Sequence, residues 1–314
     1  MTARDSFRGD PFMEIITTAA KMRERSSAWH RAGQRIGFVP TMGYLHEGHL
    51  SLIRLARCRA DVVVVSIFVN PTQFGPAEDL AAYPRDFEGD AQRCRAEGVD
   101  VLFHPPVSEM YAPDASTWVV EERLSRGLCG VARPTHFRGV CTVVARLFNL
   151  VGPDVAVFGE KDAQQLRVVR RMVRDLGFPV EIAAAPTVRE PDGLAMSSRN
   201  RYLTPEERRQ AVCLRRALDE AERRYAAGER RAAVLEQAMR ETLAAAPAAR
   251  PDYVEIVNDE TLEPVATCDQ PVLVALAVHF GRARLIDNTR LPPAESPDLY
   301  RAKNGNQPPN RPPQ

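Results

Sequence analysis

The chain has 314 residues, of which 44% are hydrophobic and 26% charged, a balance that excludes a disordered chain and allows one large domain or two ordinary ones. Its 42 Lys and Arg residues nearly match its 41 Asp and Glu residues, and a formal net charge of +1 argues against a general nucleic-acid binder. The apolar runs are far shorter than the ~20 residues of a membrane span, and the first twelve residues lack the apolar core of a secretory signal. Six scattered cysteines without a CxxC pair favour reduced thiols, so we expect a cytoplasmic protein that binds neither membranes nor nucleic acid.

Short apolar runs alternate with helical patterns through the first two-thirds of the chain, which predicts a parallel sheet wrapped by crossover helices. The predicted strands are 36–39, 62–69, 101–103, 155–158 and 180–184. The predicted helices lie near 51–58, 87–97, 139–150 and 163–176, and Gly177 is placed to end the last of them. The pattern therefore predicts an α/β fold with a Rossmann-like, doubly wound parallel sheet.

The composition changes after Pro186. Thr204-Pro205-Glu206-Glu207 predicts a helix start, with an N-cap, a proline at the first position and acids in the first turn. A long Arg/Ala/Glu-rich helix to about residue 226, a helix at 231–245 and strands at 253–257, 272–278 and 283–286 follow. We therefore expect a flexible N-terminal extension (1–12), a Rossmann-like domain (13–186), a smaller α+β C-terminal lid domain (187–290) and a disordered Pro-rich tail (291–314).

The most informative segment is PTMGYLHEGH, from Pro40 to His49, which follows a predicted strand and precedes a predicted helix. In a doubly wound fold this junction lies at the carboxyl edge of the sheet, where ligands bind. Gly43 and Gly48 allow close approach to the backbone, and the spacing of His46 and His49 lets both rings face one anion if Gly48 opens the helix. The segment therefore predicts a nucleotide site of the HxGH type.

Two further segments fit contacts with phosphate groups. The segment 159–162, GEKD, follows a predicted strand and carries Lys161, one of three lysines in a chain that otherwise uses arginine. A compact ammonium on a flexible stem suits phosphate oxygens. Ser197, Ser198 and Arg199 could bind a triphosphate from the opposite side. A solvated turn at 159–162 and a simple polar loop at 192–200 are the alternatives.

Glutamines follow two of the predicted strands. Gln73 lies in the loop after the strand at 62–69, and Gln164 and Gln165 begin the helix after the GEKD segment. A neutral amide near a phosphate site can hydrogen-bond substrate hydroxyls or a carboxylate without adding charge. Most glutamines are surface residues, so a position that faces solvent is the alternative for each of them.

Five segments, PTMGYLHEGH, SIFVNPTQF, FGEKDAQQL, DGLAMSSRNRYL and VHFGRARLIDN, together resemble the pantothenate synthetase (pantoate–β-alanine ligase) family of the HxGH nucleotidyltransferase superfamily. The resemblance runs in order from about residue 13 to residue 290, and the HxGH segment alone would indicate only the superfamily. Tyr44 stands where many members have Ala, which leaves the histidine spacing intact. The N-terminal extension and the tail lie outside the match.

The resemblance implies an AMP-forming ligase that joins (R)-pantoate to β-alanine, with ATP as co-substrate and Mg²⁺ as cofactor, in pantothenate and coenzyme A biosynthesis. Pantoate would attack the α-phosphate of ATP to give pantoyl adenylate and pyrophosphate, and β-alanine would then displace AMP. The resemblance also implies a homodimer formed through the N-terminal domain; the protein ligands of the metal stay unassigned. The implied roles are ATP binding by Met42, Gly43, Tyr44, Leu45, His46, Glu47, Gly48, His49, Gly159, Glu160, Lys161, Asp162, Val188, Met196, Ser197, Ser198 and Arg199, with His49 as proton donor, and pantoate binding by Gln73 and Gln165, with Gln73 also near β-alanine.

The charges of the implied reaction suggest roles for the polar residues. Attack of a carboxylate on a phosphate is opposed by repulsion, so we expect Mg²⁺, Lys161, Arg199 and the two histidines to neutralise the charge that develops. The catalytic candidates are therefore His46, His49 and Lys161, and for the histidines we favour electrostatic stabilisation over strict general-acid catalysis. A closing loop at 196–199 would keep water from the adenylate.

Two rival functions are considered. Another HxGH enzyme, such as a cytidylyl- or adenylyltransferase, would keep the nucleotide in its product. A non-catalytic nucleotide sensor or RNA-binding scaffold belongs to a different class, and the near-zero net charge argues against it. Formation of AMP that depends on β-alanine separates the ligase from both.

Overall fold

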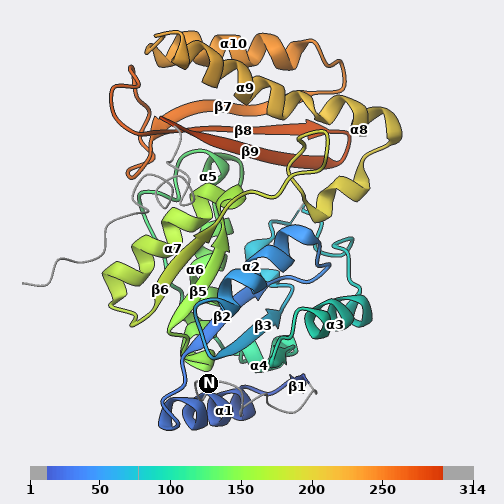
Figure 1. Ribbon diagram of the computed structural model, residues 1–314, viewed down its shortest axis with the longest axis vertical. Coiled ribbons are helices and arrows are strands. Elements are labelled where there is room, and N and C mark those ends of the chain that lie inside the picture. Colours follow the sequence, from blue (N-terminus) through green and yellow to red (C-terminus); the bar gives the residue numbers. More distant parts are fainter. Residues whose placement is uncertain (1–12, 77, 293–314) are drawn as a thin grey trace, which may run out of the picture.

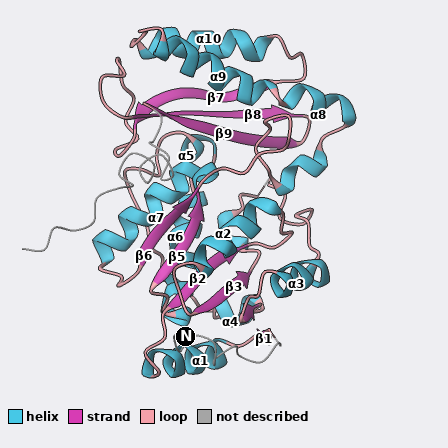
Figure 2. Ribbon diagram, in the orientation of Figure 1, coloured by secondary structure: helices cyan, strands magenta, loops and turns pink. Residues whose placement is uncertain are grey.

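The computed structural model describes residues 13–76 and 78–292, so our expectations for the N-terminal extension and for the tail beyond residue 292 lie outside the described residues. A six-stranded parallel sheet forms the lower part of the molecule in Figures 1 and 2, and a three-stranded antiparallel sheet lies above its carboxyl edge. This arrangement confirms the predicted α/β class, with a doubly wound parallel sheet followed by a smaller α+β part. The predicted domain limits stay predictions; residues 186–204 lead from the last strand of the parallel sheet to the first helix of the C-terminal part.

The parallel sheet has the order β1-β4-β3-β2-β5-β6, with parallel pairing throughout. Its strands are β1 (Glu14–Ile16), β2 (Ile36–Thr41), β3 (Val62–Ile67), β4 (Val101–Phe103), β5 (Val155–Gly159) and β6 (Glu181–Ala185). Every residue of β3 is buried, as expected for a central strand covered on both faces. The chain order reverses between β2 and β5, and such a switch point is where doubly wound sheets bind ligands.

Helices cover both faces of this sheet. Helices α2 (Glu47–Arg57) and α3 (Phe87–Ala96) pack on one face, and α1 (Ala19–Arg31), α6 (His136–Val151) and α7 (Ala163–Leu176) pack on the other. Short elements complete this part: η1 (Pro71–Gln73), α4 (Val107–Met110), α5 (Cys129–Ala132) and η2 (Glu160–Asp162). Gly177 ends α7 with a φ of 65°, as predicted. Strand β1 and helix α1 were not predicted, because three residues are too few for a strand pattern and α1 is rich in polar residues.

The second sheet consists of β7 (Arg250–Asn258), β8 (Val272–Phe280) and β9 (Ala283–Leu291), and it is covered by α9 (Cys213–Ala226) and α10 (Ala232–Ala244). Before them come η3 (Ser198–Tyr202) and α8 (Pro205–Ala211). The capping box of Thr204 and Glu207 confirms the predicted helix start. The prediction of one continuous helix to residue 226 is wrong: α8 ends at Ala211 and α9 begins at Cys213, with Val212, at a ψ of −17°, between them.

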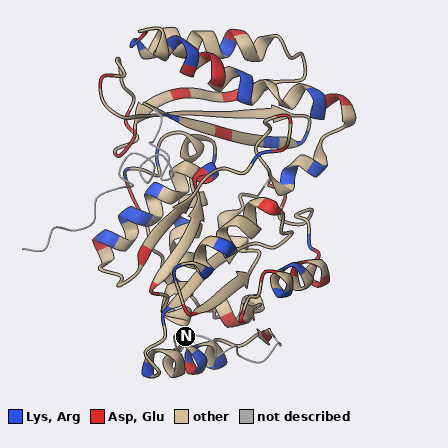
Figure 3. Ribbon diagram, in the orientation of Figure 1, with Lys and Arg blue, Asp and Glu red and all other residues tan. Residues whose placement is uncertain are grey.

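The outer helices carry both signs of charge. Figure 3 shows acidic and basic residues interspersed along α9 and α10. On α9, Arg223 and Arg224 each lie 2.7 Å from Glu220, at the helical spacings i,i+3 and i,i+4. Within residues 13–76 and 78–292, no helix has the length and apolar character needed to cross a membrane.

Candidate active site

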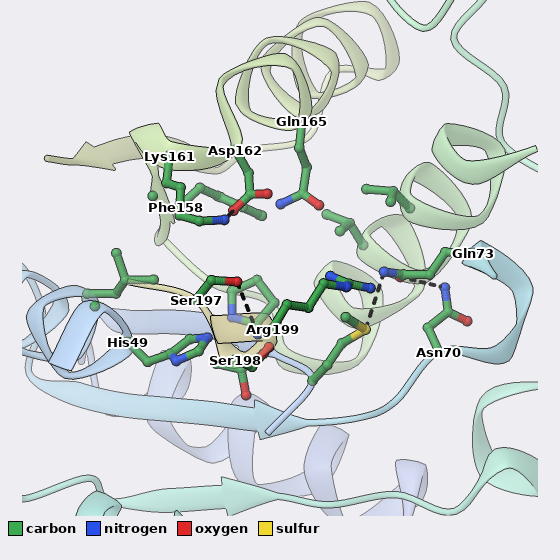
Figure 4. Close-up of a pocket in the computed structure, with 18 of the residues that line it drawn as sticks. His49, Asn70, Gln73, Phe158, Lys161, Asp162, Gln165, Ser197, Ser198 and Arg199 are labelled. Atoms are coloured by element: carbon green, nitrogen blue, oxygen red, sulfur yellow. Dashed lines mark hydrogen bonds and ion pairs between the residues drawn. The ribbon is translucent and has the colours of Figure 1, made fainter. Parts of the chain in front are cut away.

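A pocket of about 240 Å³ lies at the carboxyl ends of β2, β3, β5 and β6 (Figure 4). Each segment that the sequence analysis assigned to ligand binding contributes residues to the wall of this pocket. The predicted residues that line it are Met42, His46, Gly48, His49, Gln73, Gly159, Lys161, Asp162, Gln165, Val188, Met196, Ser197, Ser198 and Arg199. Five other predicted residues, all within the described part of the chain, lie on the same segments but outside the wall: Gly43, Tyr44, Leu45, Glu47 and Glu160.

The turn between β2 and α2 is fixed by a buried carboxylate. Gly43 has a φ of 82° and Tyr44 a φ of 52°, in the left-handed region that favours glycine. Asp90 of α3, which is 1% exposed, accepts hydrogen bonds from the backbone N–H of Tyr44 at 2.7 Å and of Leu45 at 2.6 Å. A Cβ at Gly43 would lie 3.0 Å from Asp90 Oδ2. Asp90 and Gly43 therefore together set the path of the chain that leads to His46.

Helix α2 begins at Glu47, earlier than the predicted start at residue 51, because His46 caps it. His46 Nδ1 accepts a hydrogen bond from the N–H of Gly48 at 3.2 Å, and His49 Nδ1 accepts one from the N–H of His46 at 3.2 Å. The two ring centroids are 4.1 Å apart. A Cβ at Gly48 would lie 2.9 Å from the His46 ring, so glycine allows this contact. Both rings thus lie at the N-terminus of α2, although Gly48 is the second helical residue rather than the first.

The hydrogen bonds also define the protonation of the histidines. Each Nδ1 accepts a hydrogen bond from a backbone N–H, so each neutral ring carries its own proton on Nε2. Burial, with a smaller contribution from Lys161, lowers the pKa of His46 to about 4. Burial also lowers the pKa of His49 well below its usual value, with His46 and Lys161 acting in the same direction. Near pH 7 both rings are therefore neutral hydrogen-bond donors rather than positive charges that could neutralise a phosphate.

Lys161 lies on η2, between β5 and α7, and supplies a positive charge at the pocket wall. Its Nζ is 3.7 Å from Asp162 Oδ2, and its side chain is 20% exposed. Gln165, at the start of α7, points into the same pocket (Figure 4). The amide of Gln164 instead donates to the carbonyls of Leu124 and Gly127, both at 2.8 Å. Of these two glutamines, Gln165 is therefore the one that can contact a ligand in this pocket.

Gln73 is held from two sides. Asn70 Nδ2 donates to Gln73 Oε1 at 3.0 Å, which turns Gln73 Nε2 toward Met42 Sδ, 3.3 Å away. On the other side, His136 Nδ1 and Arg133 Nη2 donate to the Gln73 carbonyl at 3.0 and 3.3 Å. The Gln73 amide therefore presents its donor group to the pocket in one orientation.

The segment from Ser197 to Arg199 presents two hydroxyls and a guanidinium. Ser197 caps η3 by accepting a hydrogen bond from the N–H of Arg199 at 3.2 Å. The Arg199 guanidinium pairs with Asp79 at 3.1 Å and lies 5.8 Å from the Tyr83 ring centroid. The hydroxyl of Tyr83 is 3.4 Å from Ser198 Oγ. Residues 79–83 therefore cover this side of the pocket, and Asp79 neutralises Arg199.

Sequence reasoning assigned no role to several residues that hold the site: Asn70, Asp79, Asp90, Arg133 and His136. Asn70 carries a usable signal, because an asparagine before a proline often caps a turn. Asp90 has no such signal, since a single aspartate in a polar helix usually faces solvent. Its role depends on a contact across 46 residues of sequence, which only the fold supplies.

The described residues contain no group of three or more His, Cys, Asp or Glu side chains placed to hold a metal ion. Asp162 lines the pocket beside Lys161, and its side chain is 48% exposed. Mg²⁺ is commonly bound through one or two carboxylates together with phosphate oxygens of a substrate. Asp162 therefore fits a metal that binds together with a nucleotide.

The chain matches the family model for pantoate-beta-alanine ligase over residues 14–290. The chain belongs to the pantoate-beta-alanine ligase family. The pantothenate synthetase of Thermotoga neapolitana is 60% identical over 279 residues, which cover 89% of this ligase and 100% of that protein. The pantothenate synthetase of Anaeromyxobacter dehalogenans is 57% identical over 286 residues, 89% of this chain and 99% of that protein.

Solved structures agree with this membership. The crystal structure of pantothenate synthetase from Thermus thermophilus has a TM-score of 0.84 and 52% identity, over 88% of this ligase and 98% of that chain. The pantoate-beta-alanine ligase from Francisella tularensis, complexed with β-γ ATP and β-alanine, has a TM-score of 0.74 and 33% identity, over 88% and 97%. These matches span both sheets of the fold.

Proposed function

We propose that this ligase condenses (R)-pantoate with β-alanine to form pantothenate, with ATP as co-substrate and AMP and pyrophosphate as the other products. Membership in the family and similarity to a ligase complexed with β-γ ATP and β-alanine support this function. The observation that carries it is the composition of the pocket, where neutral histidine donors and the cations Lys161 and Arg199 lie beside two glutamine amides. The histidine donors and the cations suit a triphosphate, and the glutamine amides suit a small hydroxy acid.

We assign the nucleotide to the part of the pocket around the N-terminus of α2. The partial positive charge of a helix N-terminus and the donors of His46 and His49 favour an anion there. Lys161 and Arg199 add full positive charges from two other segments. The proposed ATP-binding residues are Met42, Gly43, Tyr44, Leu45, His46, Glu47, Gly48, His49, Gly159, Glu160, Lys161, Asp162, Val188, Met196, Ser197, Ser198 and Arg199.

We assign pantoate to Gln73 and Gln165, which extend into the pocket from η1 and α7 (Figure 4). Their amides can hydrogen-bond the hydroxyls and the carboxylate of pantoate without adding charge next to the phosphates. Because Asn70 occupies Gln73 Oε1, the Gln73 amide offers its N–H donors, which suit a carboxylate oxygen. We place β-alanine near Gln73 as well, so that its amine can reach the same carboxyl carbon.

In the first step, a carboxylate oxygen of pantoate attacks the α-phosphorus, and the bond from that phosphorus to the pyrophosphate oxygen breaks. The Lys161 ammonium and the Nε2–H groups of His46 and His49 stabilise the charge that builds up on the phosphate oxygens. The pyrophosphate can leave as an anion, so this step requires no proton transfer. The Nε2 proton of His49 is nevertheless available for the proton-donor role that the family resemblance implies.

In the second step, the amine nitrogen of β-alanine attacks the carboxyl carbon of pantoyl adenylate. A carbon–nitrogen bond forms, the carbon–oxygen bond to AMP breaks so that AMP leaves with the bridging oxygen, and the proton lost by the amine nitrogen passes to solvent. The adenylate reacts readily with water, so the cover provided by residues 79–83 and 196–199 favours aminolysis over hydrolysis.

The proposal includes Mg²⁺, which we expect Asp162 to hold together with oxygens of the bound triphosphate. When bound, the ion would offset the negative charge of the phosphates. Lys161, 3.7 Å from the same carboxylate, would then bind a different phosphate oxygen.

We also propose a cytoplasmic homodimer that associates through the parallel-sheet part of the chain. Trp118 and Val120, in the segment between α4 and α5, are 40% and 54% exposed although both are large and apolar. Exposed apolar residues that lie close together often mark a protein interface. All six cysteines are free, which suits a reducing compartment. Sedimentation equilibrium of the wild type and of Trp118→Glu tests the dimer; a monomeric wild type refutes it.

Pantoate-dependent exchange of labelled pyrophosphate into ATP tests the proposed function. With ATP and pantoate but no β-alanine, the first step is reversible while the adenylate is held, so label should enter ATP. Addition of β-alanine should then yield AMP and pantothenate. Absence of pantoate-dependent exchange, or formation of ADP, would point to an acyl phosphate route. A product that retains the nucleotide would instead support the rival transferase.

A further inference from the structure

Strand β9 of the C-terminal sheet reaches the turn that carries Lys161. Asn288 lies on β9, and its Nδ2 donates to the backbone carbonyl of Glu160 at 3.0 Å and to that of Lys161 at 2.9 Å. The residue before the turn, Gly159, provides no side-chain hydrogen bond to cap it. The amide of Asn288 therefore fixes the main chain at Glu160 and Lys161, and this main chain determines where the Lys161 side chain points.

The neighbouring residue on β9 holds a second segment of the pocket. Asp287, whose side chain is 0% exposed, accepts two hydrogen bonds from Arg189, at 2.7 and 3.0 Å. Arg189 forms an isolated β-bridge with Ala195, and the N–H of Met196 donates to the carbonyl of Val188 at 3.0 Å. Val188 and Met196 both line the pocket. Two consecutive residues of β9 thus contact two segments to which we assign the nucleotide.

We infer that Asn288 is a positioning residue for adenylate formation, acting through the main chain of Glu160 and Lys161. The inference rests on the proposed function, which gives Lys161 its phosphate. A long, flexible ammonium side chain can reach one phosphate oxygen in many ways, so its backbone must be fixed for the charge to be preorganised. Displacement of a catalytic group by about 1 Å can cost about 10²-fold in rate. Asn288 supplies that constraint from the other sheet.

The hydrogen bonds of Asn288 are not the only polar contacts that hold the parallel-sheet part and the C-terminal sheet together. Arg167 of α7 donates to the carbonyl and the carboxylate of Asp259, and the same carboxylate binds Arg290 of β9. This network, in which Arg167 and Asp259 are largely buried and Arg290 is 42% exposed, joins α7 to the C-terminal sheet through other residues. Loss of the Asn288 amide should therefore loosen the Lys161 turn without separating the sheets.

The experiment compares Asn288→Ala with a matched control, Asn258→Ala. The Asn258 side chain also makes two hydrogen bonds to the main chain of the C-terminal part, from the N–H groups of Glu260 and Thr261, both at 2.9 Å. Both variants should lose similar stability in thermal unfolding. Asn288→Ala should lower the turnover of pantoate-dependent pyrophosphate exchange about 10- to 100-fold, the loss expected when Lys161 is displaced by up to about 1 Å, while the pantoate KM stays nearly unchanged. Asn258→Ala should keep wild-type exchange.

A double-mutant cycle with Lys161→Ala separates positioning from a general structural effect. If Asn288 acts through Lys161, Asn288→Ala should lower exchange by less than about threefold once Lys161 is already alanine. Equal losses in both backgrounds, or equal exchange in Asn288→Ala and Asn258→Ala, overturn the inference. A wild-type enzyme without exchange refutes the proposed function instead, so the two failures are distinguishable.

Discussion

Acidification should destabilise this ligase through His136, which lies beneath Gln73. His136 is 9% exposed, and its Nδ1 donates to the Gln73 carbonyl at 3.0 Å. Burial, with a smaller contribution from Arg133, lowers its pKa to about 4. In the unfolded chain a histidine titrates near pH ~6.5. Between these values the unfolded state binds a proton that the folded state does not, so the free energy of unfolding falls as the pH falls through this window.

The size of the effect follows from the difference between the two pKa values. A difference of about 2.5 units predicts a loss of about 3 kcal/mol between pH ~7 and pH ~4, of which about 2 kcal/mol is already lost at pH ~5. Carboxylates, and His46 and His49 with their lowered pKa values, contribute to the pH dependence over the same range, so the test needs a variant that removes only His136. The informative variant is His136→Asn, whose side-chain amide can still donate to the Gln73 carbonyl but binds no proton in this range.

The measurement is urea unfolding of the wild type and of His136→Asn at several pH values from about 7 to about 5, without substrates. The wild type should lose stability more steeply than the variant, by up to about 1.4 kcal/mol per pH unit, which corresponds to one extra proton bound on unfolding. Parallel curves for the two proteins would show that His136 does not have a lowered pKa in the folded state. That result would also remove the argument that the ring donates to Gln73 in its neutral form.

Three further predictions concern the pocket. Lys161→Ala should keep the circular dichroism spectrum but lower pyrophosphate exchange by about 10²- to 10³-fold, the usual loss for one preorganised charge-stabilising group; near-wild-type turnover would contradict its phosphate role. In calorimetry, Gln165→Ala should weaken pantoate about 10- to 100-fold through unpaired polar groups and leave ATP affinity nearly unchanged, whereas His49→Ala should mainly impair nucleotide use; equal loss of both ligands in Gln165→Ala would refute this division of the pocket. Asp90→Asn should lower stability by about 1–3 kcal/mol and weaken ATP binding, since an amide nitrogen cannot accept one of the two backbone hydrogen bonds; unchanged urea unfolding would argue against its role in the turn.

The parallel sheet and the histidine turn could be predicted from the sequence because their signals are local. The runs of apolar residues at β3 and β5 have no polar face, which is typical of buried parallel strands. The turn after β2 is encoded by glycines and histidines within ten residues. Local patterns therefore placed β2 to β6 within about two residues, but they missed the three-residue strand β1 and the start of α2. That start was missed because a histidine is an unusual N-cap.

The supporting residues could not be predicted, because each acts across a long stretch of sequence. Asn288 holds a turn 127 residues earlier in the chain, and Arg199 pairs with Asp79 across 120 residues. Asn288 lies beyond the predicted strand at 283–286, and in β9 itself burial alternates, so a polar residue there would be expected to face solvent. The role of such a residue is set by its hydrogen-bond or ion-pair partner, and that partner can be identified only once the fold has brought the two segments together.

The charges of the pocket are balanced within the protein before any substrate binds. Lys161 lies beside Asp162, Arg199 pairs with Asp79, and Arg133 pairs with Glu78 at 2.6 Å. Without such partners, half-buried cations would carry a large desolvation cost. A triphosphate that binds Arg199 must therefore replace or share Asp79, so the free energy of that ion pair is subtracted from the gain of the new contact. The neutral histidines have no counter-ion to displace, and their Nε2–H groups can bind phosphate oxygens without this cost. In this pocket a cation must give up part of its ion pair before it can bind a phosphate oxygen, whereas a neutral histidine can bind one directly. The histidine N–H groups are therefore preorganised for the phosphate and the cations are not.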